Sequence, residues 1–244
     1  MTDFAPASAA EALLAARRDR NPIPIPVTGP RDEAEAYAVQ DEVARGLGAP
    51  GAWKVGGGAA APIAQGLVRP SPCRWPGGEF IRRGIEAEIA FRIGRDLATD
   101  GRMPSRDEIR AAIGSVHAAI EIADSRFDTW PSQAKLWALA DNMSNGGFVH
   151  APEGLPYDGR PLGRHQVTVT ADGREVFAAE GVNAGGEPFE LLVQLVGLSR
   201  TRGGVQAGCY VTTGSLCGIV FVEPSAAVVA EIAGFGRVEI DFGA

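Results

Sequence analysis

The sequence predicts an α+β fold with a helical cap at its N-terminus, and three observations support this prediction. Two segments, over residues 8–20 and 31–47, space their apolar residues as amphipathic helices do. From residue 81 onward, apolar and polar residues alternate as in strands that bury one face. The 244 residues contain no internal repeat and no linker of 15 residues, which favours one compact unit. We expect a helical cap and loop region over residues 1–80 and a β-rich core over 81–244.

The first 80 residues are expected to hold the two helices and little regular structure besides. Ser8 is a candidate cap for the helix over 8–20, and the proline-rich stretch 21–30 cannot continue that helix. The helix over 31–47 begins with acidic residues and ends near glycines, as the helix dipole and C-cap preferences favour. GAWKVGGG, over 51–58, reads as a short strand that runs into a glycine loop. Residues 58–80 predict a loop with room for one short helix.

The remaining residues predict strands with three helices between them. GIEAEIAFRIG, over 84–94, has one apolar face, and a helix over 105–114 starts with a capping-box-like Ser105 and Glu108. Asp172-Gly173 predicts the turn of a hairpin over 165–181. The other expected elements are a strand at 116–123, a loop and helix through ALADNMSNGG (138–147), a helix at 187–201, and closing strands at 209–222 and 236–242.

Composition excludes several classes of protein. A formal charge of −7 and a pI near 5.1 argue against a nucleic-acid-binding protein, which would show a basic patch. No apolar run reaches the length of a membrane span, and the N-terminus lacks the basic and apolar regions of a secretory signal. The three cysteines, Cys73, Cys209 and Cys217, form no CxxC pair. We therefore expect reduced thiols and a cytoplasmic protein.

Three carboxylates require an explanation. Glu86 and Glu88 stand two apart on an expected strand and therefore project from the same face, where they repel each other. Glu121 lies in AAIEIA, among apolar residues where a free carboxylate is costly. Oxygen ligands without a neighbouring His or Cys suit Mg²⁺ or Mn²⁺. On spacing alone, a metal site and a solvated strand face remain about equal alternatives.

The chain also resembles the 2-keto-4-pentenoate hydratase and 2-oxohepta-3-ene-1,7-dioate hydratase branch of the fumarylacetoacetate hydrolase superfamily. The resemblance runs over nearly the full length. It rests on six segments in the expected order: EAYAVQDEV, GAWKVG, GIEAEIAF, IEIADSRF, ALADNMSNGGFV and VTTGSLCGIVFVEPSAAVVAEIAGFGRVEIDF. It implies a mixed, multilayered β core with outer helices, which makes residues 81–244 the catalytic core. It also implies a homo-oligomer.

The resemblance assigns roles to residues of this chain. The family's E-x-E and the third acid about 30 residues later fall on Glu86, Glu88 and Glu121, which would bind Mg²⁺ or Mn²⁺. Lys54, in the W-K-V-G segment, would stand at the mouth of the metal site. We expect a cation and partial desolvation to lower the pKa of Lys54 and to suit it to proton transfer. Lys135, the second of only two lysines, reads as an ordinary solvated side chain.

Further residues match motifs around the family's site. Asp124 and Arg126 in the D-S-R segment, with Ser144 in A-D-N-x-S, would orient Glu121 and its loop. Asn142 of the same segment, with Thr213 and Gly214 of the T-G segment, would bind the substrate. An ordinary turn into a strand is the structural alternative for Thr213 and Gly214.

The chain departs from the family at two places. The family's acid after the W-K-V-G segment is missing, because no acid stands between Lys54 and Glu79, and the family's aspartate before A-D-N is Trp137 here. The preferred function is a metal-dependent hydratase of small 2-hydroxydienoic or 2-oxo-enoic acids in aromatic meta-cleavage catabolism. The missing acids leave two alternatives. One is a 2-oxo-acid decarboxylase or C–C hydrolase, and the other is a catalytically silent assembly partner.

Overall fold

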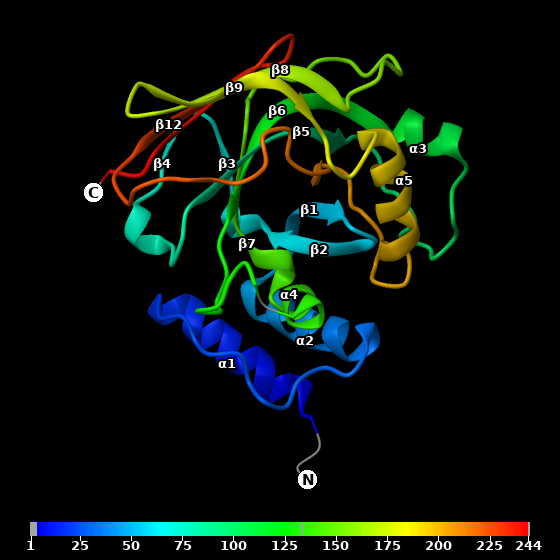
Figure 1. Cartoon of the computed structure of the whole chain (residues 1–244). Coiled ribbons are helices and arrows are strands. Elements are labelled where there is room, and N and C mark those ends of the chain that lie inside the picture. The colour runs from blue at the N-terminus through cyan, green and yellow to red at the C-terminus, as the bar shows by residue number, and fades with distance from the viewer. Residues whose placement is uncertain (1–3, 133, 244) are drawn as a thin grey trace.

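A computed structural model describes residues 4–132 and 134–243 as two sheets stacked on a layer of helices. In Figure 1 the smaller sheet lies at the top, the larger sheet below it, and the N-terminal helices at the bottom. The first three residues and Ala244, which belong to the expected ranges 1–80 and 81–244, lie outside the described residues. Within the described part of the chain, no helix is both long and apolar enough to cross a lipid bilayer.

The larger sheet carries the candidate site and has eight strands among the described residues. Its central strands β5 and β6 pair antiparallel over their whole length. The path runs through β2 (Ala59–Ala64), β1 (Pro50–Gly56), β10 (Tyr210–Thr212), β5 (Gly84–Ile93), β6 (Ile113–Ala123), β7 (Asn145–His150) and β3 (Val68–Pro70), and β11 (Val220–Phe221) pairs with β5.

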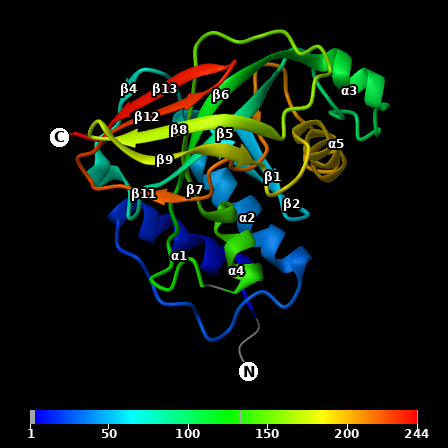
Figure 2. The ribbon, with the colours of Figure 1, turned by 45° about the horizontal axis from the view of Figure 1, so that its top comes forward.

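The smaller sheet has five strands in the described residues. Its order is β4 (Cys73–Arg74), β13 (Gly236–Asp241), β12 (Ala227–Ile232), β8 (Arg164–Ala171) and β9 (Arg174–Val182). Strands β8 and β9 form the expected hairpin. Asp172 (φ 52°) and Gly173 (φ 72°) at its turn both have the positive φ that the hairpin turn requires. Figure 2 shows these strands crossing in front of β5 and β6.

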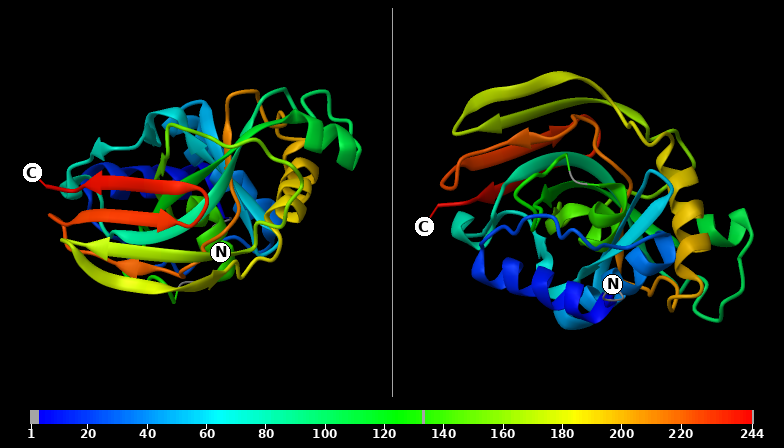
Figure 3. Two further views of the ribbon diagram at one scale, coloured as in Figure 1. Left: turned by 90° about the horizontal axis from the view of Figure 1, so that it is seen from above. Right: turned by 60° about the horizontal axis from the view of Figure 1, so that its bottom comes forward.

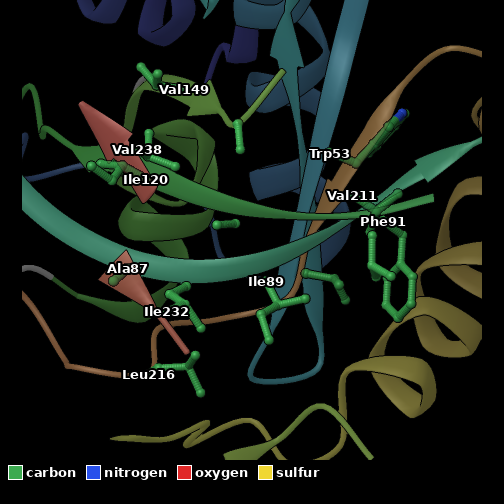
Figure 4. Packing of buried hydrophobic residues seen from close by; sticks show 14 of the residues in the cluster. Trp53, Ala87, Ile89, Phe91, Ile120, Val149, Val211, Leu216, Ile232 and Val238 are labelled. Atoms are coloured by element: carbon green, nitrogen blue, oxygen red, sulfur yellow. The ribbon is translucent and has the colours of Figure 1, made fainter. Parts of the chain in front are cut away.

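The main hydrophobic core lies between the two sheets. On β5, Ile85, Ala87 and Ile89 are buried in this core and alternate with the glutamates, which face the other side of the sheet. Figure 4 shows Ala87, Ile89 and Ile120 of the larger sheet with Ile232 and Val238 of the smaller one. One face of β5 therefore supplies apolar packing, and its other face is free to carry polar chemistry.

Helices cover that second face. Helices α1 (Pro6–Asp19), α2 (Glu33–Leu47) and α4 (Lys135–Ala140) form the lower layer of Figure 1, in which α2 packs on α1 and on α4. The right view of Figure 3 brings the N-terminal helices, in blue, to the front. Helix α5 (Pro188–Ser199) packs beside β1 and β2. Helix α3 (Arg106–Ala112) begins with the expected capping box, in which Ser105 and Glu108 exchange hydrogen bonds. The predicted helices over 8–20, 31–47, 105–114 and 187–201 are confirmed, with ends shifted by a few residues.

The expectation of a loop over residues 58–80 is wrong. This stretch contains strands β2, β3 and β4 and two short 3₁₀ helices, Gln65–Leu67 and Gly77–Glu79. The sequence concealed β2 because its small side chains, AAAPIA, are buried on both faces and show no alternation. Strands β1, β2 and β3 belong to the same sheet as β5, so this sheet contains strands from both sides of residue 80. The division of the chain into a cap and a core at residue 80 stays a prediction.

Candidate metal centre and active site

The three glutamates named from the sequence meet on one face of the larger sheet. Glu86 on β5 pairs directly with Glu121 on β6, and Glu88 follows two residues further along β5. One carboxylate oxygen from each residue can be chosen so that all three lie within 4.8 Å of one another. Glu88 and Glu121 are each only 1% exposed, while Glu86 is partly exposed. The strand pairing therefore brings together three carboxylates that could hold a single ion.

Burial of these carboxylates has a large effect on their protonation. Desolvation raises the pKa of Glu88 to about 8, and the negative charges of Glu121 and Glu86 add to this effect. Desolvation likewise raises the pKa of Glu86 to about 7, against the opposing charge of Lys54. Like charges held together out of water are stabilised by a bound cation. An all-oxygen set of three carboxylates fits Mg²⁺ or Mn²⁺.

Each of the two buried glutamates uses one oxygen within the protein. Glu121 Oε1 accepts hydrogen bonds from Lys54 Nζ at 2.5 Å and from Asn145 Nδ2 at 3.1 Å. Glu88 Oε2 accepts from Thr212 Oγ1 and from the Gly214 backbone N–H at 2.7 Å. The second oxygen of each carboxylate makes no hydrogen bond within residues 4–132 and 134–243. The carboxylates are therefore held from one side and leave the other side open to a ligand.

Lys54 closes one side of the carboxylate group. It is on β1, its side chain is 13% exposed, and its Nζ also donates to the Met143 carbonyl at 3.0 Å. Burial alone lowers the pKa of Lys54, but the charges of Glu121, Glu86 and Glu88 together outweigh it and raise the pKa above its usual value. The lowered pKa was expected beside a bound cation, so it stays a prediction for the metal-bound protein. Lys54 is held as an ammonium by the carboxylates beside it.

A strained turn supplies the carbonyl that Lys54 contacts. The expected helix through ALADNMSNGG ends at Ala140, and Asn142, Met143 and Ser144 follow with left-handed φ values of 48°, 52° and 58°. Left-handed backbone in residues other than glycine costs energy and is concentrated at functional sites. Here the turn directs one carbonyl to Lys54, while the Ser144 carbonyl accepts from the Asp124 N–H at 2.7 Å.

The residues predicted to bind substrate are engaged with the protein itself. Thr213 Oγ1 donates to the Ile89 carbonyl at 3.3 Å, and Asn142 Nδ2 lies 3.4 Å from the Pro62 carbonyl. Gly214 has a φ of 109° and holds Glu88 through its N–H. Their assignment to the substrate stays a prediction.

Two residues that contact the glutamates were missed by the sequence analysis. Thr212 stands directly before the recognised T-G segment, and Asn145 directly after A-D-N-x-S. The sequence could have indicated both residues, because each has a hydrogen-bond donor in its side chain and lies next to a motif that the resemblance matched.

A second buried cluster supports the turn beside the site. Arg126, 1% exposed, donates through Nε to Asp141 Oδ1 at 2.5 Å and through Nη1 to the Asn145 carbonyl at 2.9 Å. Asp124 accepts from the Arg82 backbone N–H at 2.8 Å. Ser144 is buried at the turn. The expected role of Asp124, Arg126 and Ser144 in orienting Glu121 stays a prediction, and Asp141, the main acidic partner of Arg126, had no assigned role.

A cavity of about 380 Å³ opens in front of Lys54 and Glu86. Its outer wall is mainly apolar and includes Trp130, Leu136, Leu139, Met143 and Ile219, with two charged residues, Glu33 and Lys135. Lys135 is exposed, as expected, but it lines this cavity. Trp137 packs against Phe4 and Phe127 in the helical layer instead. The cavity thus places Lys54 and one of the three carboxylates, Glu86, at an apolar chamber large enough for a small organic acid.

Curated relatives share part of this sequence. A 2-keto-4-pentenoate hydratase from Paraburkholderia xenovorans (strain LB400) is 31% identical over 159 residues, covering 65% of this chain and 58% of the relative. The 2-keto-4-pentenoate hydratase 1 of Dechloromonas aromatica (strain RCB) is 33% identical over 173 residues, covering 68% of this chain and 62% of the relative. The chain thus spans about three fifths of the length of these relatives. No family model matches it.

Two solved structures share all or most of the fold. A 4-oxalocrotonate decarboxylase from Pseudomonas putida G7, complexed with magnesium and adipate, has a TM-score of 0.83 at 22% identity and covers 99% of both chains. A fumarylpyruvate hydrolase from Pseudomonas aeruginosa, in complex with Mn²⁺ and pyruvate, has a TM-score of 0.53 at 15% identity over 75% of this chain and 77% of that one. The expected mixed multilayer β fold is confirmed. The chain is similar in sequence to 2-keto-4-pentenoate hydratases and shares its fold with the 4-oxalocrotonate decarboxylase and the fumarylpyruvate hydrolase, in agreement with the resemblance found in the sequence.

Proposed function

We propose that this protein is a divalent-metal-dependent hydratase of small 2-hydroxydienoic or 2-oxo-enoic acids. One observation carries the proposal: three glutamates, two of them buried, meet beside one lysine, and Glu86 and this lysine line an apolar cavity. Such a set suits a reaction in which negative charge develops on a 2-oxo acid. The hydratase relatives and the metal-bound structures with the same fold support this assignment.

Glu86, Glu88 and Glu121 would hold Mg²⁺ or Mn²⁺ through the oxygens that face one another. When bound, such a cation acts as a Lewis acid that stabilises negative charge on the oxygens of a 2-oxo acid. Lys54, held by Glu121 and Met143, presents an ammonium whose Nζ proton can neutralise charge on the substrate or be transferred to it. In hydration, one proton and one hydroxide are added across the substrate's carbon–carbon double bond. The apolar wall of the cavity limits the access of further water.

Decarboxylation is the second candidate, and a specific feature of the chain favours it. Glu79, the next acid after Lys54, accepts a hydrogen bond from Trp75 Nε1 at 2.8 Å and does not line the cavity. Loss of CO₂ leaves its electron pair on the remaining fragment as an enolate, so the reaction needs charge stabilisation and one proton but no activation of water. The overlap with a 4-oxalocrotonate decarboxylase over 99% of both chains agrees with this alternative.

Two substrates separate these candidates. The metal-loaded protein is incubated with 2-hydroxypenta-2,4-dienoate and with 4-oxalocrotonate, and the loss of dienol absorbance and the release of CO₂ are measured. Loss of the dienol with formation of the 4-hydroxy-2-oxo acid supports the hydratase. CO₂ release with an unchanged dienol would replace the hydratase with the decarboxylase. Intact Mg²⁺ binding without turnover of a panel of 2-oxo acids would identify a silent assembly partner.

Three further proposals concern the location of the protein, its oligomeric state and its division into two regions. We propose that the protein is cytoplasmic, since Cys73, Cys209 and Cys217 are all free thiols. We also propose that it forms a homo-oligomer, and size-exclusion chromatography with light scattering tests this directly. Finally, the division into a helical cap (1–80) and a catalytic core (81–244) is proposed, and limited proteolysis would show whether residues 81–244 persist alone.

A further inference from the structure

Glu121 is held by two donors that come from different parts of the chain. Lys54 reaches Oε1 from β1, and Asn145, 1% exposed at the start of β7, donates to the same oxygen. An oxygen that accepts two donors is fixed in direction, and its carboxylate partner Oε2 is fixed with it. Asn145 is not one of the residues that the resemblance assigned to the site.

Asn145 is itself held by two arginines. Its backbone carbonyl accepts from Arg126 Nη1 at 2.9 Å and from Arg17 Nη2, whose guanidinium also donates to the Gly146 carbonyl at 3.3 Å. Arg17 is on the last turn of α1, so the N-terminal helical layer contacts the residue that holds Glu121. A buried asparagine fixed at its backbone by two cations has little freedom to turn its side chain away from the carboxylate.

We propose that Asn145 is a positioning residue that directs the free oxygen of Glu121 towards Glu86 and Glu88, with Arg17 of α1 and Arg126 holding Asn145 in place. The proposal rests on the metal-dependent function proposed above. Outer ligands of this kind are worth about 10- to 100-fold in metal affinity or activity. Arg17 acts through Asn145, so its removal should have the same direction and a smaller size.

Metal affinity is the first measurement. Mg²⁺ and Mn²⁺ dissociation constants are determined by calorimetry for the full chain and for Asn145→Ala, Asn145→Ser and Arg17→Met. We expect Asn145→Ala to weaken binding about 10- to 100-fold. The serine variant should recover part of this loss, because its hydroxyl keeps one donor, and Arg17→Met should weaken binding less than Asn145→Ala. Gln40→Met is the matched control: Gln40 is a fully buried amide that donates to the Leu139 carbonyl and contacts none of the glutamates.

The chain offers a second readout that needs no metal. Lys54 and Lys135 are its only lysines, so a spectrum of protein labelled at lysine ¹³Cε contains two signals. In metal-free protein, Asn145→Ala should shift the Lys54 signal, because Glu121 Oε1 changes its position, and should leave the Lys135 signal unchanged. Gln40→Met should shift neither.

These measurements separate the two proposals. Unchanged Mg²⁺ affinity in Asn145→Ala, or an equal loss in Gln40→Met, would overturn the positioning role and leave the metal site standing. If the unaltered protein binds neither Mg²⁺ nor Mn²⁺, the proposed function fails. A Lys54 shift in Asn145→Ala would then still support the positioning of Glu121, and an unshifted Lys54 signal would remove that role as well.

Discussion

The structure contains two buried clusters of charged side chains that differ in their balance. The cluster around Arg126 joins two arginines, Arg17 and Arg126, with two aspartates, Asp124 and Asp141, so its formal charges cancel. The cluster around Glu121 joins three glutamates with the single ammonium of Lys54, which leaves a formal excess of two negative charges. Asn145 connects the two, because its carbonyl accepts from Arg126 and its amide donates to Glu121.

The difference indicates what each cluster is for. A balanced, hydrogen-bonded set of buried charges can persist by itself, because every ion has a partner that compensates for lost hydration. An excess of two negative charges in the interior is costly, and the raised pKa values of Glu86 and Glu88 are the response of the isolated chain. A divalent cation removes that excess. The glutamate cluster is therefore suited to the cation proposed above, and the arginine cluster is suited to support it.

The strongest test of the difference between the two clusters is to remove one charge from the glutamate cluster. We expect Glu88→Gln to lower activity about 1,000-fold or more, which corresponds to ~4 kcal/mol of transition-state stabilisation. It should also abolish the increase in Tm produced by Mg²⁺. Glu79→Gln is the control, because Glu79 lies outside the cluster and bonds Trp75. Turnover and differential scanning fluorimetry with and without Mg²⁺ make the measurement, and a surviving Mg²⁺ shift would show that the ligands are wrongly assigned.

Removing one charge from the arginine cluster should mainly lower the free energy of unfolding of the metal-free protein. Arg126→Met leaves Asp141 buried without its main cation, and breaking such a pair costs about 3–5 kcal/mol of the free energy of unfolding. Urea unfolding should show this loss already in EDTA, and the loss should be somewhat larger in Mg²⁺, because Arg126 also holds Asn145 beside Glu121. The comparison would be contradicted if Arg126→Met were as stable as the unaltered protein, or if added Mg²⁺ restored its stability completely.

The pH dependence of stability should also reveal the excess charge. The folded-state pKa values of Glu88, about 8, and Glu86, about 7, lie above the ordinary value of 4.5, so the metal-free folded state binds more protons than the unfolded state. Stability from these groups is therefore present below about pH 4.5 and is lost as pH rises through 7 to 8. At ~1.36 kcal/mol per pKa unit, the upper limit of this loss is about 8 kcal/mol, and we expect a decrease in Tm of ~10 °C or more in EDTA.

The same titration gives the sign of the Mg²⁺ effect. Metal binding displaces the protons from Glu86 and Glu88, so the increase in Tm caused by Mg²⁺ should grow from pH 5.5 to pH 8. Melting curves in EDTA and in Mg²⁺ at these two pH values, with Glu88→Gln as the control, provide the measurement. A Mg²⁺ shift that is constant over this range would mean that the cation does not compete with these protons.

Sequence patterns predicted the glutamate cluster well because a strand places its side chains with a fixed period. Glu86 and Glu88 share a face on any strand, and the apolar flanks of Glu121 indicated its burial. The same patterns could not predict β2, whose buried small residues have no period. They also missed Asn145 and Asp141, because which polar group meets which carboxylate depends on the left-handed turn at 142–144. The raised pKa of Lys54 in the protein alone could not be predicted for a related reason, since it depends on the sum of three neighbouring charges.

The two lysines provide the smallest expected effect and the most selective test of the cavity. Lys54 touches Glu121, whereas Lys135 is exposed on the first turn of α4 and contacts the cavity only at its outer wall. Lys135→Met should change kcat/KM for 2-hydroxypenta-2,4-dienoate by less than about threefold, since a partly solvated charge at this distance is worth ~0.2–1 kcal/mol. Lys54→Met should remove most activity under the same assay. Equal losses of kcat/KM in both variants would mean that Lys135 belongs to the site as much as Lys54 does. The distinction between a buried lysine bound to Glu121 and a solvated one would then be false.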